Sequence, residues 1–119
     1  MKTCKSGGAK NGVIQFTDVE ISNGIHNTDS IKTSGIFTCE NPGLYLISVY
    51  IATNTKHGEY NLYKNSNSIA WVYSSITDYA MTISMTVIKQ LTVNDTISVH
   101  GSLFVGAGYG SCLHILQIQ

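Results

Sequence analysis

Arginine is absent from this 119-residue chain, and charged side chains of any kind are scarce. Charged residues make up 12% of the sequence, about half the share in an average soluble protein, and the formal net charge is zero. Such a surface releases few counterions from phosphate, which argues against nucleic-acid binding. The lysines are scattered instead of clustered, so insertion into or binding to an anionic membrane is not expected either.

Long apolar runs and catalytic motifs are also missing. The longest nearly apolar run, Leu44 to Ala52, is too short to span a bilayer. No nucleophile elbow, P-loop or dinucleotide fingerprint occurs, and Gly106, Gly108 and Gly110 lie in a predicted hairpin instead of between a strand and a helix. The carboxylates are spread over turns and strand ends, so no pair is placed to shift one pKa against the other. The sequence therefore predicts a protein without enzymatic activity.

What the chain does contain is period-two alternation punctuated by turn residues. Asn41-Pro42-Gly43 is turn chemistry, because proline fixes φ and glycine accepts positive φ. The alternate residues from Tyr45 to Ile51 should then share one face of a strand. Strands are predicted at Val13–Glu20, Ile36–Thr38, Leu44–Ala52, Glu59–Lys64, Ile69–Tyr73, Tyr79–Gln90, Thr96–Leu103 and Cys112–Ile118. Short strands at this spacing, with almost no helix, predict an all-β chain folded as a two-sheet antiparallel jelly-roll β-sandwich.

Two of these strands differ in the composition of their faces. The strand from Met81 to Val87 alternates apolar with polar residues, which is typical of one face in the core and one in water, and we expect it in an outer sheet. The last strand is apolar on both faces, with Cys112, Leu116 and Ile118 on one and Leu113 and Ile115 on the other. Its second face must be covered, most simply by another copy of the chain, although the segment around Phe16 is an alternative cover.

Residues 33–51 closely resemble the globular head of complement component 1q, a domain of the tumour-necrosis-factor-like superfamily. The family pattern is matched by Gly35, Phe37, Thr38, Cys39, Pro42, Gly43 and Tyr45. Further along, 61–65 is similar to the family's Gly-Leu-Tyr-Lys-Asn strand end and 91–99 to its Leu-x-x-Asn-Asp-x-Val-x-Val hairpin. Ile47 and Val49 stand where the family usually has aromatics, a difference that the fold should tolerate.

The resemblance implies one complement component 1q-like globular domain over residues 1–119, with a flexible N-terminal segment at 1–12. It also implies a secreted protein, a buried free thiol at Cys39, and a compact homotrimer packed through its inner sheets. We expect the trimer interface at Tyr60, Leu62, His100, Leu113 and Ile115.

Many members of the resembled family bind calcium near the trimer apex through acidic residues. Here Met81 stands at the position of the family's aspartate, and 73–75 lacks the Asp-Glu pair of the preceding loop. Because hard cations need several oxygen ligands, binding through Asp78 alone would be weak. We therefore expect no metal or other cofactor, with calcium as the alternative.

The chain has three cysteines: Cys4, Cys39 and Cys112. Their number is odd and their spacing is not that of a metal site, so a disulfide framework is not implied, and at least one thiol should be free or intermolecular. Cys112 and His114 share a strand face, where three copies around an axis would present a metal site, but a histidine satisfied within the core is the favoured interpretation. His57 and His100 either line a ligand groove or lie in solvent.

Recognition by loops on a rigid sandwich is the function that remains. The loops are rich in neutral polar and aromatic residues, which suit sugar hydroxyls and the C–H face of a pyranose. The predicted ligand-binding residues are Asn54, Lys56, His57, Glu59, Ser75, Asp78, Tyr79 and Tyr109.

The chain is similar to soluble complement-type lectins of invertebrate innate immunity, which bind microbial or sialylated glycans and gain avidity through trimerisation. The absence of a Gly-x-y repeat fits that group. Two alternatives stay open: a cytokine-like or adaptor trimer that binds a protein receptor, and a structural matrix assembly module. Asn94-Asp95-Thr96 is an N-glycosylation sequon, accessible in a hairpin turn if the chain is secreted.

Overall fold

The computed structural model describes residues 1–5, 8–22, 25, 28–74, 80–105 and 108–119, and the side chains of residues 5, 8–11, 21, 104, 108 and 109 are outside that description. The strands of this part of the chain are β1 (Lys2–Lys5), β2 (Gly8–Val13), β3 (Asp18–Ile21), β4 (Phe37–Thr38), β5 (Gly43–Thr53), β6 (Glu59–Lys64), β7 (Asn67–Tyr73), β8 (Met81–Leu91), β9 (Thr96–Val105) and β10 (Gly108–Gln117). A six-residue helix, α1 (Asp29–Ser34), precedes β4. Within the described residues, no helix has the length and apolar character needed to cross a membrane.

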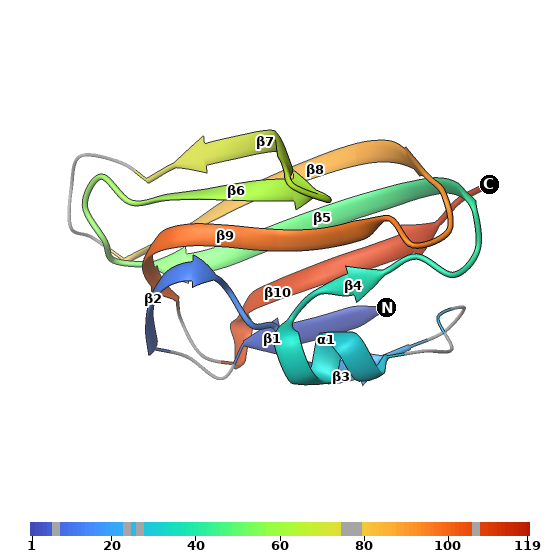
Figure 1. The fold of residues 1–119 in the computed structure, drawn as a ribbon. Coiled ribbons are helices and arrows are strands. Elements are labelled where there is room, and N and C mark those ends of the chain that lie inside the picture. Colours follow the sequence, from blue (N-terminus) through green and yellow to red (C-terminus); the bar gives the residue numbers. More distant parts are fainter. Residues whose placement is uncertain (6–7, 23–24, 26–27, 75–79, 106–107) are drawn as a thin grey trace.

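The strands form two antiparallel sheets that lie face to face (Figure 1). The first sheet has the strand order β3-β1-β10-β5-β8, and the second has the order β2-β9-β6-β7, with β4 pairing to β9. This arrangement confirms the predicted all-β, two-sheet jelly-roll sandwich with almost no helix. The short helix ends at Gly35, whose φ of 76° lies in the left-handed region that glycine adopts without strain.

The core fills the space between the two sheets. Alternate residues of β5 from Tyr45 to Ile51 are buried, as their spacing predicts, and they meet Tyr60 and Val99 of the second sheet in one apolar cluster. Each large apolar side chain buried there contributes about 1.5–3 kcal/mol. The hydroxyl of Tyr60 donates a hydrogen bond to the Ile83 carbonyl at 2.9 Å, and burial raises the pKa of this side chain, so it stays neutral inside the sandwich.

Four residues expected at a trimer interface belong to this core. Tyr60, Leu62, Leu113 and Ile115 have no exposed surface in a single chain, so their assignment to an interface between copies is wrong. Period-two alternation identifies the two faces of a strand but not which of them points inward. The structure shows that the inward face of β10 carries Leu113 and Ile115.

The described positions of the N-terminal segment lie in strands, β1 in the first sheet and β2 in the second, where a flexible segment at residues 1–12 was expected. β1 lies between β3 and β10, and a disulfide joins Cys4 to Cys112 across the paired strands, with their Cα atoms 4.1 Å apart. The terminal amine of Met1 donates a hydrogen bond to the Ile115 carbonyl at 2.7 Å. Because Cys112 is oxidised, a metal site made of Cys112 and His114 is also excluded, whereas Cys39 is a buried free thiol, as expected.

The alternation in β8 led us to expect this strand in an outer sheet, separate from the last strand. That expectation is wrong, because β8 and β10 belong to the same sheet. The strand β8 pairs with β5 along its whole length, from Met81 opposite Thr53 to Leu91 opposite Gly43, at the edge of the sheet that contains β10. The alternation of half-buried and exposed residues along β8 therefore reflects its position at the edge of the first sheet. The predicted strand at 13–20 is also divided, because β2 ends at Val13 and β3 begins at Asp18.

Candidate ligand-binding site

Among the described residues, the predicted ligand-binding side chains divide between a loop and a sheet face. Asn54, Lys56 and His57 are exposed in the loop between β5 and β6, while Glu59 is the first residue of β6. Ser75, Asp78 and Tyr79 lie outside the described residues, as does the side chain of Tyr109. Of the described predictions, Glu59 is the one that lines the hollow described next.

A hollow of about 180 Å³ opens on the outward face of the second sheet, and we call it the outer hollow. It is lined from β2, β6 and β9 by Gly12, Glu59, Asn61, His100, Gly101 and Ser102. Opposed residues of antiparallel strands share a face, and the register places Glu59 opposite Ser102 and Asn61 opposite His100. Gly12 has a φ of 95° and open space where a Cβ would be, so no side chain from β2 fills the hollow at this point.

His100 is held in place by its neighbours on the same face. Its ring stacks on Tyr63, with centroids 4.1 Å apart and planes inclined by 29°, and its Nε2 lies 3.1 Å from the hydroxyl of Ser98. Burial lowers the pKa of the His100 imidazole, so the ring is neutral near pH 7. Of the two positions left open for His100, the structure places its half-buried ring in the lining of the outer hollow and not in open solvent. The assembly role expected for this residue is not tested by a single chain.

Two large aromatic side chains border the hollow on the edge strand β7. Trp71 is 60% exposed and Tyr73 is 63% exposed. The register places Trp71 opposite Asn61 and Tyr73 opposite Glu59, so both rings project from the face that contains the outer hollow. The outer hollow is therefore lined by polar groups and bordered on the β7 side by aromatic side chains.

These bordering residues were not among the sequence predictions, although the sequence contains a signal for them. In Trp71-Val72-Tyr73 the middle residue packs against the core, so strand alternation turns both aromatics outward. The aromatic content of the segment is visible in the sequence. Which face is outward follows only when the core position of Val72 is known.

The first sheet presents a very different outward face. Leu46 of β5 stands opposite Leu116 of β10 and Ile88 of β8, and Ile118 follows at the end of β10. Ile88, Leu116 and Ile118 are 55%, 53% and 42% exposed in the single chain. We call this row the apolar face, and it is the surface that the two-sided pattern of the last strand predicted.

Next to the apolar face, Tyr50 and His114 form a ring pair with centroids 5.7 Å apart. The pKa of the His114 imidazole is lowered, mainly by burial and to a smaller extent by the positive charges of Lys2 and the terminal amine. His114 is therefore neutral near pH 7 and adds no charge to this part of the sheet.

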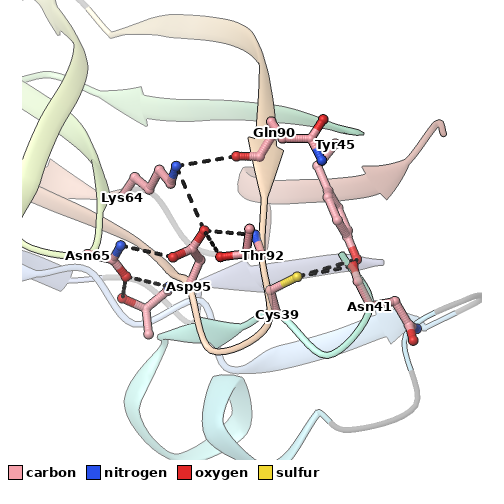
Figure 2. A network of polar contacts seen from close by, with 9 residues as sticks. Cys39, Asn41, Tyr45, Lys64, Asn65, Gln90, Thr92 and Asp95 are labelled. Atoms are coloured by element: carbon pink, nitrogen blue, oxygen red, sulfur yellow. Dashed lines mark hydrogen bonds and ion pairs between the residues drawn. The ribbon is translucent and has the colours of Figure 1, made fainter. Parts of the chain in front are cut away.

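At the end of β6 remote from Glu59, polar contacts join two hairpin turns (Figure 2). The Asp95 carboxylate accepts hydrogen bonds from the Thr92 backbone at 2.8 Å and from Asn65 Nδ2 at 3.1 Å, and it lies 3.8 Å from Lys64 Nζ. Together these contacts lower the pKa of Asp95, and the hydrogen bond from the Thr92 backbone is the largest cause. Asn94 of the sequon is exposed in this turn with a φ of 75°, a position that an attached glycan can occupy.

Cys39 and Tyr45 share an acceptor beneath the same end of the sandwich (Figure 2). The Tyr45 hydroxyl donates to the Asn41 carbonyl at 2.6 Å, and the Cys39 thiol donates to the same oxygen at 3.2 Å. Burial is the main cause that raises the pKa of Tyr45 to about 12. The Tyr45 hydroxyl is therefore neutral near pH 7, and the hydrogen bonds of both groups indicate a structural role.

One cluster of potential metal-ligating atoms occurs in the described part of the chain. Cys4, Glu20 and Cys112 have their ligand atoms within 4.8 Å of one another, but both sulfurs are joined in the disulfide. A single carboxylate remains, which is too few oxygens for a hard cation.

Comparisons with known proteins agree with this architecture. The globular domain of zebrafish complement 1qA protein superposes with a TM-score of 0.71 at 17% identity, covering 99% of this chain and 95% of that one. Pika GITRL superposes with a TM-score of 0.53 at 19% identity, covering 71% of this chain and 77% of that one. At these identities both likenesses concern the fold.

In sequence, the mouse collagen alpha-1(X) chain is 35% identical over 65 residues, which span 54% of this chain and 10% of the mouse protein. This chain thus matches a small part of that relative. The family model of the C1q domain matches residues 1–108. The resemblance seen at residues 33–51 is therefore confirmed, and the chain belongs to the C1q domain family.

Proposed function

We propose that this C1q domain is a secreted, non-enzymatic lectin of innate immunity that assembles as a homotrimer and binds glycans at the outer hollow. Members of the family are generally non-enzymatic recognition modules, C1q/TNF-like folds typically form homotrimers, and C1q-domain homologues are typically secreted. The glycan ligand and the position of its site are our additions to that general description.

The observation that carries the glycan proposal is the outer hollow with its aromatic border. Asn61, Ser102 and His100 offer both donors and acceptors, which is what paired sugar hydroxyls require. Trp71 and Tyr73 offer exposed rings on which the C–H face of a pyranose packs. The volume of about 180 Å³ is below the roughly 300–1,000 Å³ of drug-sized pockets, so the hollow suits one sugar ring of a longer chain.

The apolar face supports the assembly part of the proposal. A contiguous row of exposed aliphatic side chains is unusual on a monomer and is typical of a surface that another protein covers. Leu46, Ile88 and Leu116 lie in register across three neighbouring strands, so a second copy can cover them together. Assembly would place three hollows on one particle, which raises avidity for repetitive glycans.

Secretion and glycosylation are supported by the oxidation state of the chain. A disulfide between Cys4 and Cys112 is typical of oxidising compartments, such as the extracellular space. On its way to secretion, the exposed Asn94 sequon would also meet the glycosylation machinery in the lumen of the endoplasmic reticulum. Treatment of the secreted protein with an endoglycosidase should shift its mass, and Asn94→Gln should abolish the shift.

A glycan array tests the lectin proposal, with the trimer assayed in calcium and in chelator. We expect binding to a subset of microbial glycans under both conditions. A Trp71→Ala variant with unchanged assembly should lose the signal, and a Val93→Ala variant, altered at an exposed turn, should keep it. Silence on every glycan while the trimer is intact would end the lectin proposal.

A second candidate is a cytokine-like or adaptor trimer, for which the same exposed aromatics would serve as anchors in a protein interface. Recovery of a single protein partner, lost in Trp71→Ala and not displaced by any sugar, would favour it. The similarity to the mouse collagen chain favours the other alternative, a structural matrix module. In that case, replacing Trp71 and Tyr73 would leave activity intact.

A further inference from the structure

Glu59 is the one acidic side chain that lines the outer hollow. It stands between Tyr73 of β7 and Ser102 of β9 in the strand register, and its side chain is half-buried. In the described part of the chain, the Glu59 carboxylate has no hydrogen bond and no ion pair. A carboxylate partly withdrawn from water and left without a partner is unfavourable, so this position is prepared for a ligand that brings a donor or a positive charge.

No compensating positive charge lines the hollow among the described residues. Lys64, on the same strand, is held at the other end of β6 by Asp95 at 3.8 Å and the Gln90 carbonyl at 3.3 Å. His100 is the only other titratable group of the lining, and burial lowers its pKa, so it is neutral near pH 7. An acidic sugar would therefore face Glu59 without a counterion.

The neighbours of Glu59 supply aromatic rings and neutral hydrogen-bonding groups. Trp71 and Tyr73 present ring faces that pack against the C–H side of a pyranose and also attract a nearby cation. Asn61 and Ser102 supply neutral hydrogen-bonding groups beside the carboxylate. A ligand that matches all three features has a sugar ring, free hydroxyls and a positive charge.

We propose that the outer hollow binds a protonated amino sugar, a hexosamine with a free amine, whose ammonium group pairs with Glu59 while the ring packs on Trp71 and Tyr73. This inference rests on the proposed function and sharpens it, because it selects cationic sugars over acidic ones. Sialylated glycans, which the family resemblance brought forward, become the disfavoured class.

Isothermal titration of the intact protein near neutral pH tests this selectivity. The probes are a glucosamine tetramer, its N-acetylated counterpart, sialyllactose, and free lysine, which has an ammonium group but no sugar ring. We expect the glucosamine tetramer to bind about fivefold more tightly than the N-acetylated one, the size expected for a partly exposed ion pair. The preference should weaken as salt is raised.

Glu59→Gln should remove this preference, because an amide of the same shape cannot pair with the ammonium group. Asp18→Asn is the matched control: it removes the same charge from an exposed position on the first sheet and should leave the preference intact. Thermal unfolding of both variants checks that each is folded.

The outcomes separate this inference from the broader proposal. Equal or tighter binding of the N-acetylated tetramer or of sialyllactose would overturn the amino-sugar assignment and leave the lectin function standing. Preference retained in Glu59→Gln, or lysine bound as well as the tetramer, would also overturn it. Failure of every carbohydrate to bind would remove both.

Discussion

The outward faces of the two sheets follow the same alternation and carry opposite chemistry. The first sheet presents Leu46, Ile88 and Leu116 in one row on its outward face, whereas the second presents Glu59 and Trp71 around a hollow. An aliphatic row has no hydrogen-bonding capacity, so its ideal partner is another dry surface. A hollow with polar walls and aromatic edges suits a hydrated ligand. Under the function proposed above, one sandwich would separate assembly from recognition by assigning each to its own sheet.

The largest expected effect comes from a charge in the apolar face. Leu116→Glu should dissociate the trimer, because a buried unpaired carboxylate costs about 3 kcal/mol or more at each contact between copies. Sedimentation velocity would report monomers. Val93→Glu places the same charge at an equally exposed apolar residue (53% for each side chain) in the β8–β9 turn and should leave the assembly intact. A trimer that survives Leu116→Glu would assign the interface to another surface.

Removal of the disulfide should affect the first sheet more than the second. The double variant Cys4→Ala and Cys112→Ala should lose about 2–5 kcal/mol in free energy of unfolding, because the unfolded chain is no longer cross-linked. Urea unfolding measures the loss, and a reducing agent should destabilise the native protein but not the variant. If the double variant unfolded at the same urea concentration as the native protein, the disulfide would contribute nothing to stability.

Trp71→Ala should affect only the second sheet. Loss of the exposed ring should weaken glycan binding by about 2 kcal/mol, roughly thirtyfold, with a change in stability below about 0.5 kcal/mol. Titration calorimetry and thermal unfolding measure the two quantities. Trp71→Phe should restore part of the affinity. An unchanged affinity in Trp71→Ala would separate the aromatic border from the binding site.

The smallest expected effect is on acid stability, to which each face contributes one histidine. Burial lowers the pKa of His100 and of His114 from the ordinary value of 6.5. The native state then binds fewer protons than the unfolded chain, so the stability that these groups provide is complete above about pH 6.5 and declines as the pH falls below that value. His100→Gln and His114→Gln should each reduce the acid-induced shift in the urea midpoint. A shift identical in the native protein and both variants would contradict this assignment.

Much of the sandwich could be predicted from sequence, because local alternation reports burial. The β5 positions from Tyr45 to Ile51 and the bounds of β6 follow from that signal and from the turn at Pro42. β1 could not be found this way, since Lys2-Thr3-Cys4-Lys5 is short and polar and becomes a strand through its pairing with β3 and β10. The sheet to which β8 belongs could not be predicted either, because it is decided by pairing with β5, which is distant in the sequence.

The candidate site was predicted less completely than the fold. Glu59 was found because it adjoins a polar loop, and His100 was left between a groove and solvent. Trp71 was missed because an exposed aromatic in a strand looks like a core residue until its neighbours are placed. The assumed interface residues of β10 were on the wrong side for the same reason: alternation provides two faces and no inward direction.

The link between Cys4 and Cys112 spans 108 positions, so nearly the whole polypeptide lies inside one covalent ring. A protease that nicks the exposed segment at 54–57 would produce two fragments that remain tied together, and each would still hold its part of the first sheet. Such a nicked domain would migrate as one species until a reductant releases the halves. Resistance to a single cut is therefore built into the pairing of β1 with β10, the first and last strands of the chain.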